Sequence, residues 1–471
     1  MGRVTGDAAR KQLGAWYTPP GLVTEIVDAV VTAEFVAARG GRPITVVDPA
    51  CGDGRFLRAV EARVRALGGS TVLHGVDIDA RAVAAARSTV ASARIERGDA
   101  LSWSGWSSPY DLVIGNPPFL SQMALRTTRG GSSERGGGPY ADVAVEFVAL
   151  AVELVDPSGG RLAFVLPQSV LSSRDAGPIR RRVDERAALV WSSWTGAHRF
   201  EAHVHTCAVA FEFGSGHGAG IDWPAVVTGP RGVPEVPATV DALGTLSDRA
   251  TLNANFRDEY YAMAAAVGEQ DTGPPLITSG LIDPGTCRWG QRPVTFARRR
   301  LLRPRLDLAR LDGRMATWAE RRLTPKVLVA NQTSILEAVC DPTGQWLPGV
   351  PVLGVYPTGA HWDDAAGDRE ATVEAAWTIA AVLTSGFASA WAWRQGAGTG
   401  LSANTIRLSP VVLGRLPWPA GDLAPAVKAL RRGDVRSCAG SVDEAYGVSD
   451  EVVRWWTTSL DRIEARRARG A

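Results

Sequence analysis

The sequence predicts an α/β protein with a mostly parallel seven-stranded sheet in roughly its first 220 residues, followed by an α+β domain. The first observation is that short β-branched runs alternate with amphipathic helical stretches, the pattern of a parallel sheet covered by helices on both faces. The second is that acidic residues, glycines or asparagine follow several of these runs. Rossmann-like doubly wound sheets bind their ligands at those carboxyl ends of strands.

The expected elements alternate along the chain. We expect strands at 44–48, 71–77, 93–97, 111–115, 162–166, 189–195 and 206–213. We expect helices at 21–39, 56–67, 80–90, 140–155 and 177–186. These ranges supply the seven strands of a Rossmann-like domain.

The remaining chain is less regular. Residues 221–245 are rich in Gly, Pro and Val and predict a linker. The part beyond it carries 10 of the 16 tryptophans, a strand at 326–330 and a helix at 370–383. Helices at 423–432 and 449–469 follow. We therefore expect a first domain at 1–220, a linker at 221–245, an α+β domain at 246–420 and a C-terminal helical segment at 421–471.

Composition indicates an ordinary globular protein, with 45% hydrophobic and 21% charged residues. The chain has no uninterrupted apolar stretch of about 18 residues, and its first residues are polar, so we expect no membrane association and a cytoplasmic location. The five cysteines are scattered, which predicts reduced thiols rather than disulfides or a metal site.

Charge is informative only locally, because the net charge is +2. Between Arg298 and Lys326 the chain carries ten Lys/Arg and three acids, a local net charge of 10 − 3 = +7. This pattern fits a solvated helix face as well as a surface for nucleic acid.

The first chemical motif is Asp48-Pro49-Ala50-Cys51-Gly52-Asp53-Gly54. An acidic residue ends a strand, and glycines tighten the turn into the following helix. Glycines here let the backbone approach a nucleoside-bearing cofactor closely. Other nucleotide folds and plain turns share this pattern, so it does not identify the ligand.

Two further carboxylates end the next strands. Asp77 can accept both hydrogen bonds of a ribose diol. Asp79 is explained as a helix N-cap. Asp99, in Gly98-Asp99-Ala100, could accept a hydrogen bond from the amino group of a cofactor adenine.

The most specific motif is Asn116-Pro117-Pro118-Phe119, directly after the strand 111–115. A turn explains the prolines but not the Asn before them or the aromatic after them. An exocyclic amine conjugated to a base is a poor nucleophile. The Asn116 side-chain oxygen and the Pro117 carbonyl can each accept one amine hydrogen, which frees the lone pair for methyl transfer. Phe119 offers a face for a base rotated out of the duplex.

With these motifs and the leading segment 14–20, Gly-Ala-Trp-Tyr-Thr-Pro-Pro, the chain resembles an N6-adenine DNA methyltransferase of the gamma arrangement. The resemblance covers residues 14 to about 213. It implies a methyltransferase domain, S-adenosyl-L-methionine as cofactor, double-stranded DNA as substrate, and a following target recognition domain, here 246–420. It also implies a restriction-modification or phage-defence setting with further partner proteins.

By resemblance, Thr18 would bind the methionine carboxylate, Asp48 and the glycine turn the methionine end, Asp77 the ribose and Asp99 the adenine. The implied cofactor-binding residues are Tyr17, Thr18, Asp48, Ala50, Cys51, Gly52, Gly54, Asp77, Ile78, Asp99, Ala100, Asn116 and Phe147. Phe147 is equally well explained as helix core.

The implied DNA contacts are Phe119, Phe200, Arg126, Arg129 and Arg298, with Arg135 in the same loop as Arg126. Phe200 fits a second stacking aromatic and a core position equally well. His203 and His205 lack a third metal ligand, so we expect no metal site. Residues 397–408 and 416–419 resemble segments that close recognition domains in such methylases.

Three alternatives remain. The Asn-Pro-Pro-aromatic signature also serves glutamine-amide methyltransferases of release factors and guanine-N2 methyltransferases of ribosomal RNA. A non-catalytic DNA recognition subunit would lack a chemical need for the set Asp48, Asp77, Asp99 and Asn116. A fused endonuclease would need a domain before residue 14 or a nuclease motif behind, so we expect methylation without cleavage.

Overall fold

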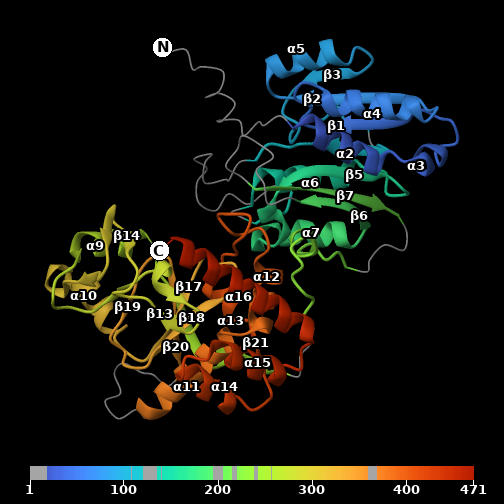
Figure 1. The fold of residues 1–471 in the computed structure, drawn as a ribbon. Coiled ribbons are helices and arrows are strands. Elements are labelled where there is room, and N and C mark those ends of the chain that lie inside the picture. The colour runs from blue at the N-terminus through green and yellow to red at the C-terminus, as the bar shows by residue number, and fades with distance from the viewer. Residues whose placement is uncertain are drawn as a thin grey trace, which may run out of the picture. The chain divides into compact units, whose positions relative to one another are not determined.

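The computed structural model describes residues 18–107, 109–119, 135–138, 141–194, 205–214, 220–237, 242–255, 257–358 and 369–470. The chain divides into two compact units, Met1–Pro230 and Arg231–Ala471 (Figure 1).

Unit 1 contains the predicted seven-stranded sheet. Its strands are β1 (Ile44–Asp48), β2 (Thr71–Asp77), β3 (Arg94–Arg97), β4 (Leu112–Gly115), β5 (Arg161–Pro167), β6 (Ala187–Trp194) and β7 (Thr206–Phe213). The strand order is β3-β2-β1-β4-β5-β7-β6. All neighbours are parallel except β7, which is antiparallel to both β5 and β6. The predicted mostly parallel Rossmann-like sheet is confirmed.

Helices cover both faces of this sheet. As a result, β4 is buried at every position and β1 at four of five. They are α2 (Pro20–Val30), α3 (Ala33–Ala37), α4 (Arg55–Ala66), α5 (Ala80–Thr89), α6 (Val143–Leu154), α7 (Gly177–Asp184) and α8 (Ala225–Thr228). Helix α4 packs against α2, α5, β1 and β2, whereas α6 packs against α7 and β5.

The predicted helix 21–39 is two helices rather than one. Helix α2 ends at Val30, and Thr32 has an extended backbone and caps α3 by accepting the Phe35 N–H at 3.2 Å. A side chain that caps a new helix start explains the break within a continuous apolar pattern.

The predicted linker 221–245 is not a linker over its whole length. Trp223, Val226 and Val227 are buried. The Trp223 indole donates to Asp184 at 2.7 Å and its ring lies 5.0 Å from that of Phe211. Residues up to Pro230 therefore belong to unit 1, because their apolar side chains complete its core.

Unit 2 is α+β, as predicted. Its main sheet has the antiparallel order β18-β17-β20-β9, built from β18 (Glu337–Asp341), β17 (Lys326–Ala330), β20 (Val352–Pro357) and β9 (Ala250–Ala254). Strands β17, β18 and β20 are buried at every position.

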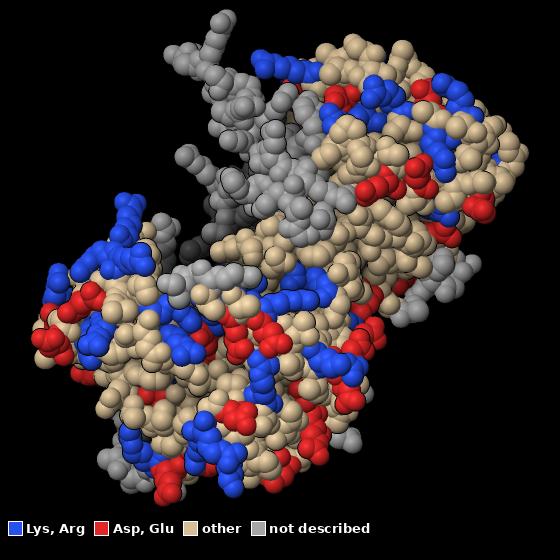
Figure 2. Space-filling model, in the orientation of Figure 1, with Lys and Arg blue, Asp and Glu red and all other residues tan. Residues whose placement is uncertain are grey.

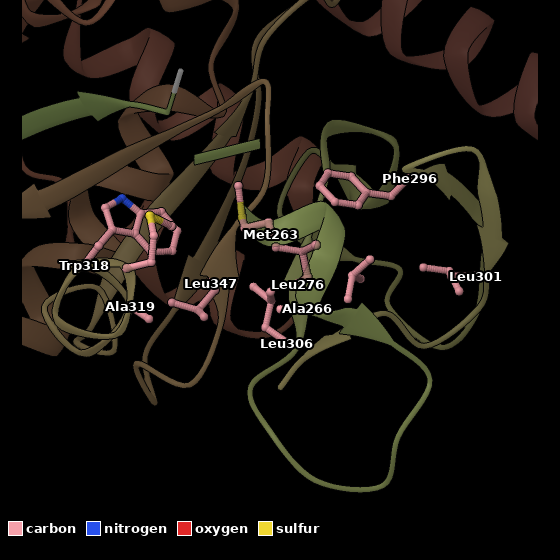
Figure 3. Close-up of a cluster of buried hydrophobic side chains, with 11 residues drawn as sticks. Met263, Ala266, Leu276, Phe296, Leu301, Leu306, Trp318, Ala319 and Leu347 are labelled. Carbon is pink, nitrogen blue, oxygen red and sulfur yellow. The ribbon is translucent and has the colours of Figure 1, made fainter. Parts of the chain in front are cut away.

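Unit 2 also contains short strand pairs, and Figure 3 shows one hydrophobic cluster of this unit. The short strands are β8 (Ala242–Thr245), β10 (Val267–Gly268), β11 (Leu276–Ile277), β12 (Ile282–Asp283), β13 (Thr286–Cys287), β14 (Val294–Phe296), β15 (Arg299–Leu301), β16 (Arg305–Leu306), β19 (Leu347–Pro348) and β21 (Pro417–Pro419). The helices nearby are α9 (Arg257–Ala266) and α10 (Gly313–Glu320).

The remaining helices of unit 2 pack together. They are α11 (Arg369–Leu383), α12 (Gly386–Gly396), α13 (Pro410–Gly414), α14 (Ala424–Arg431), α15 (Val435–Ala445) and α16 (Asp450–Gly470). Trp456 and Leu460 of α16 are buried with Ile335 and Ala439. The segment predicted separately at 421–471 is therefore part of unit 2, because its apolar faces are buried against α11 and α12.

Within the described chain, no single helix is long and apolar enough to cross a membrane. Helices α11 and α12 together have the length and composition of one broken span, with a bend of 68° between them.

Candidate active site

Three predicted residues meet at one edge of the unit 1 sheet. Strand β1 lies between β2 and β4 and is parallel to both, so the carboxyl ends of the three strands are neighbours. Asp48 and Asp77 are the last residues of β1 and β2, and Asn116 follows β4. The strand order reverses between β1 and β4, which is where such sheets form a ligand crevice.

Asp48 is the buried centre of this edge, with 1% exposure. Its Oδ1 accepts the Ala50 N–H at 3.1 Å. A Cβ at Gly115 would lie 2.5 Å from the same oxygen, so glycine is required at the end of β4. Burial raises the pKa of Asp48 well above its ordinary value, and the negative charges of Asp77 and Asp53 raise it further. A site with this charge balance favours a cationic ligand.

The glycine turn links β1 to α4. Gly52 and Gly54 have φ values of 53° and 81°, in the left-handed region that side chains disfavour. Cys51, directly before Gly52, is 3% exposed and donates its backbone N–H to the Val76 carbonyl at 3.0 Å. The turn therefore lies directly against the end of β2.

Asp77 is held in place by two backbone donors. Its Oδ2 accepts the Gly52 N–H at 2.8 Å and its Oδ1 accepts the Asp79 N–H at 2.9 Å. Burial raises the pKa of Asp77. The next side chain, Ile78, is 54% exposed. A fixed carboxylate beside an exposed apolar side chain suits a ribose and its attached ring.

The expectation that Asp79 is a helix cap is confirmed, since its side chain accepts the Arg81 N–H at the start of α5. Asp99 is next to β2 because the Gly98 N–H donates to the Asp77 carbonyl at 3.0 Å. Its Oδ1 accepts the Leu101 N–H at 3.0 Å, and Ala100 is buried.

Thr18 is 1% exposed, and its hydroxyl has no hydrogen-bond partner in the part of the chain that is described. Its carbonyl accepts a hydrogen bond from Arg55, which forms an ion pair with Asp53 at 2.6 Å. Sequence reasoning missed Arg55. The signal was its place directly after Gly54, where its side chain can tie the segment before α2 to the glycine turn.

The aromatic residues of the site are largely buried. Phe119 is 7% exposed and Phe147, on α6, is 6% exposed. Asn116 is half-buried, and Pro117 between it and Pro118 is buried. Tyr17, Arg126, Arg129, Phe200 and His203 lie outside the described residues.

Asp111 has a structural role at the opposite end of β4. It forms ion pairs with Arg39 and Arg42 at 2.7 and 2.6 Å and accepts two hydrogen bonds from Thr45. Burial raises its pKa, but the hydrogen bonds from Arg42 and Thr45 outweigh burial and lower it to about 2. Sequence reasoning did not identify this anchor, because its partners are about 70 residues away.

The predicted basic cluster 298–326 is only partly a surface. Seven of its members are exposed: Arg298, Arg299, Arg300, Arg303, Arg310, Arg314 and Arg321. Lys326 is fully buried and pairs with Asp341 at 2.6 Å. The Arg322 guanidinium covers the Trp318 ring at 4.5 Å. The prediction that the whole cluster lies on the surface is therefore wrong for Lys326, which fills a core position in β17.

Arg135, also predicted to face DNA, is bound within unit 1. It forms an ion pair with Glu153 and donates to the Leu101 carbonyl at 2.9 Å.

Unit 2 has a cavity of about 390 Å³, lined by Ala254, Asn255, Tyr260, Tyr261, Asn331, Val350, Pro351, Val352, Leu353 and Arg407. This lining contains no carboxylate or thiol, unlike the site in unit 1.

The matches to known proteins fall in the part of the chain that contains this site. Residues 3–189 match the family model described as N-6 DNA Methylase. The chain is 32% identical over 195 residues to the type II methyltransferase M.TthHB8I of Thermus thermophilus. This alignment covers 37% of the chain and spans 39% of the relative's own length. The predicted resemblance to N-6 DNA methylases is thereby confirmed for residues 3–189.

Solved structures are more distant. One is a type I restriction-modification methyltransferase subunit from Streptococcus thermophilus, at 16% identity, covering 44% of this chain and 47% of that one, with a TM-score of 0.35. Another is TrmN from Thermus thermophilus, at 20% identity, covering 38% and 48%, with a TM-score of 0.26. We draw no functional inference from either at these scores.

Proposed function

We propose, on the premise that residues 3–189 match the N-6 DNA methylase family, that this chain is a site-specific DNA methyltransferase acting on N6 of adenine. The observation that carries the proposal is the convergence of Asp48, Asp77 and the Asn116-Pro117-Pro118-Phe119 motif at the carboxyl ends of three adjacent parallel strands. We further propose that it modifies DNA within a restriction-modification or phage-defence system.

The residues of unit 1 fit S-adenosylmethionine as the cofactor. The buried Thr18 hydroxyl, which lacks a hydrogen-bond partner among the described residues, would donate to its carboxylate. Asp77 would accept the ribose hydroxyls, and the exposed Ile78 would cover one face of the adenine. The pKa values of buried Asp48 and half-buried Asp77 are raised by burial, so the positive charge of the cofactor would stabilise their ionised forms. When bound, the cofactor supplies an electrophilic methyl group.

The chain's own contribution is to prepare the amine. Pro117 fixes the backbone so that its carbonyl is presented beside the Asn116 side chain. These two oxygens would each accept one N6 hydrogen and so would favour a pyramidal nitrogen whose lone pair is available to the methyl group that the cofactor supplies. The N6 proton released by the transfer would pass to solvent. Phe119 would stack on the base during this step, which requires the adenine to leave the duplex.

DNA binding would use exposed basic side chains. Arg298, Arg310 and Arg314 of unit 2 are exposed, and we propose that Arg310 and Arg314 contact phosphates and that Arg298 also contacts DNA. Arg126, Arg129 and Phe200 remain proposed DNA contacts. By resemblance, unit 2 would be the target recognition domain.

The test is to incubate the purified chain with methyl-labelled S-adenosylmethionine and, separately, DNA, RNA and a release factor, followed by nucleoside and peptide analysis. We expect label in N6-methyladenine of DNA. Asn116→Ala should reduce the rate by about 10²-fold or more, as for loss of one preorganised hydrogen-bond partner.

Two controls make this test specific. The variant should keep its thermal unfolding midpoint, and its affinity for S-adenosylmethionine is measured so that a loss of cofactor binding is separated from a loss of the amine contacts. Label in RNA or protein would refute the proposed substrate. Undiminished turnover by Asn116→Ala would refute the mechanism, and DNA cleavage by the chain alone would refute a methylation-only role.

A further inference from the structure

We propose that the hairpin β14–β15 is a base-reading element whose apex residue, Arg298, enters a groove of double-stranded DNA and contacts base edges. The inference rests on the proposed function, because it takes DNA as the substrate. It goes further by separating a residue that reads sequence from residues that only bind phosphate.

The hairpin has an unusual apex. Phe296 pairs with Arg299 and Val294 with Leu301, which leaves Ala297 and Arg298 as a two-residue loop. Both loop residues have positive φ, 51° and 60°. Positive φ at both positions is the signature of a type I′ turn, which strongly favours Asn and Gly. An alanine and an arginine here keep a disfavoured backbone that turn formation alone does not explain.

The base of the hairpin is fixed to a hydrophobic core. Phe296 and Leu301 are 4% and 3% exposed and belong to the cluster with Met263 and Leu306 (Figure 3). The Phe296 ring lies 5.2 Å from that of Tyr260. A short hairpin anchored in this way presents its apex with little conformational freedom, so little ordering is lost on binding.

The two apex side chains differ. Ala297 is half-buried and packs against the same cluster, whereas Arg298 is exposed. Arg299 donates to the Val267 carbonyl at 2.8 Å, which ties the adjacent strand to the body of unit 2. Arg298 is therefore the side chain that the apex presents to solvent.

The guanidinium groups of Arg298 and Arg300 have no hydrogen-bond or ion-pair partner among the described residues. A carboxylate close to this hairpin, Glu269, already accepts the backbone N–H groups of Leu302 and Arg303. Figure 2 shows basic side chains gathered on the projecting part of unit 2 that Figure 1 labels β14. The apex is thus positively charged, and in the described part of unit 2 no carboxylate forms an ion pair with Arg298 or Arg300.

The geometry fits a groove better than a phosphate row. The major groove admits a two-stranded β-ribbon, and an arginine there can donate two hydrogen bonds to the O6 and N7 atoms of guanine. A flat basic surface would serve phosphates without a projecting, conformationally restricted apex. Arg314, exposed at the start of α10, is the matched basic residue outside the hairpin.

The test selects bound DNA from a random duplex library with the full-length chain, without cofactor, and compares wild type, Arg298→Ala and Arg314→Ala. We expect the wild type to enrich one sequence. Arg298→Ala should lose preference at one base pair by about fivefold to 150-fold, the effect of removing one bidentate base contact. Arg314→Ala should weaken binding to all sequences equally and keep the preference.

Folding is controlled by Arg298→Gly, which suits the positive φ and should lose the same preference while keeping the thermal midpoint. An Arg298→Ala variant that keeps the full preference, or weakens all sequences equally, would overturn the inference, as would a wild-type chain that binds DNA without preference. Failure of the proposed function is separate. A chain that enriches one DNA sequence but methylates RNA or protein would refute the proposed function and leave the hairpin assignment standing.

Discussion

Replacing Asp77 by alanine should weaken the binding of S-adenosylmethionine roughly 100-fold. Each Asp77 oxygen accepts one backbone N–H, at 2.8 and 2.9 Å, and retains a lone pair for a ribose hydroxyl. A hydrogen bond to a charged acceptor contributes about 1.5 kcal/mol at the low end of the measured range. Two such bonds give about 3 kcal/mol, which corresponds to roughly a 100-fold change in dissociation constant.

The assay is isothermal titration of the full-length chain with S-adenosylmethionine. The matched control is Asp79→Ala, because Asp79 caps α5 and its carboxylate accepts the Arg81 N–H. Loss of the cap should cost about 1 kcal/mol of stability and leave affinity nearly unchanged. Equal affinities of wild type and Asp77→Ala would refute the assignment of Asp77. An equal loss in both variants would show that the effect comes from the local backbone.

Two predictions concern stability. Asp111→Asn should lower the unfolding free energy of unit 1 by at most about 2 kcal/mol at pH 7. This limit follows from the pKa of Asp111, which is about 2 in the folded chain and ordinarily 3.8, and solvent screening of the half-exposed Arg42 reduces the effect. The lowered pKa makes this contribution complete above pH 4 and lost as pH falls through about 2. Urea unfolding of both forms at pH 7 and pH 3 measures it, and an unchanged difference at the two pH values would contradict it. Arg467→Met removes the ion-pair partner, at 2.7 Å, of Glu337, whose pKa burial raises to about 7. It should cost about 3 kcal/mol in unit 2. Because ionised Glu337 opposes folding, the cost should be largest above pH 7 and shrink as pH falls toward 5. Unfolding curves at pH 8 and pH 5.5 test it, and a pH-independent loss would argue that packing dominates.

The fold of unit 1 could be predicted because its signals are local. A buried parallel strand is an apolar run such as 112–115, and the residue after it marks the ligand edge. Asp48, Asp77 and Asn116 were therefore identified without knowledge of their neighbours. Their contacts were not predictable. The Asp48 carboxylate lies under Gly115, and this glycine is required by a neighbour 67 residues earlier in the chain.

Element boundaries failed where a single side chain decides between two backbones. Thr32 lies within the amphipathic pattern of 21–39 and does not interrupt it. Its hydroxyl nevertheless accepts the Phe35 N–H in place of a backbone carbonyl, and a new helix starts there. Likewise, the Gly- and Pro-rich composition after residue 220 suggested a linker. Trp223, with buried Val226 and Val227, instead adds apolar area and a hydrogen bond to Asp184 that hold that segment against unit 1.

Charge counting along the chain could not separate Lys326 from Arg298, although their environments are opposite. Lys326 opens an apolar strand, and the antiparallel register places it directly across from Asp341. Both side chains are fully buried at 2.6 Å, where a lone charge would be very costly. Arg298 instead occupies the apex of a two-residue hairpin, where no cross-strand partner exists to neutralise it. A basic residue that begins an apolar strand, followed by an acidic residue in the next strand, therefore indicates a buried ion pair. A basic residue between two pairing strands indicates a charge available to a partner, and this difference is visible only once the register is known.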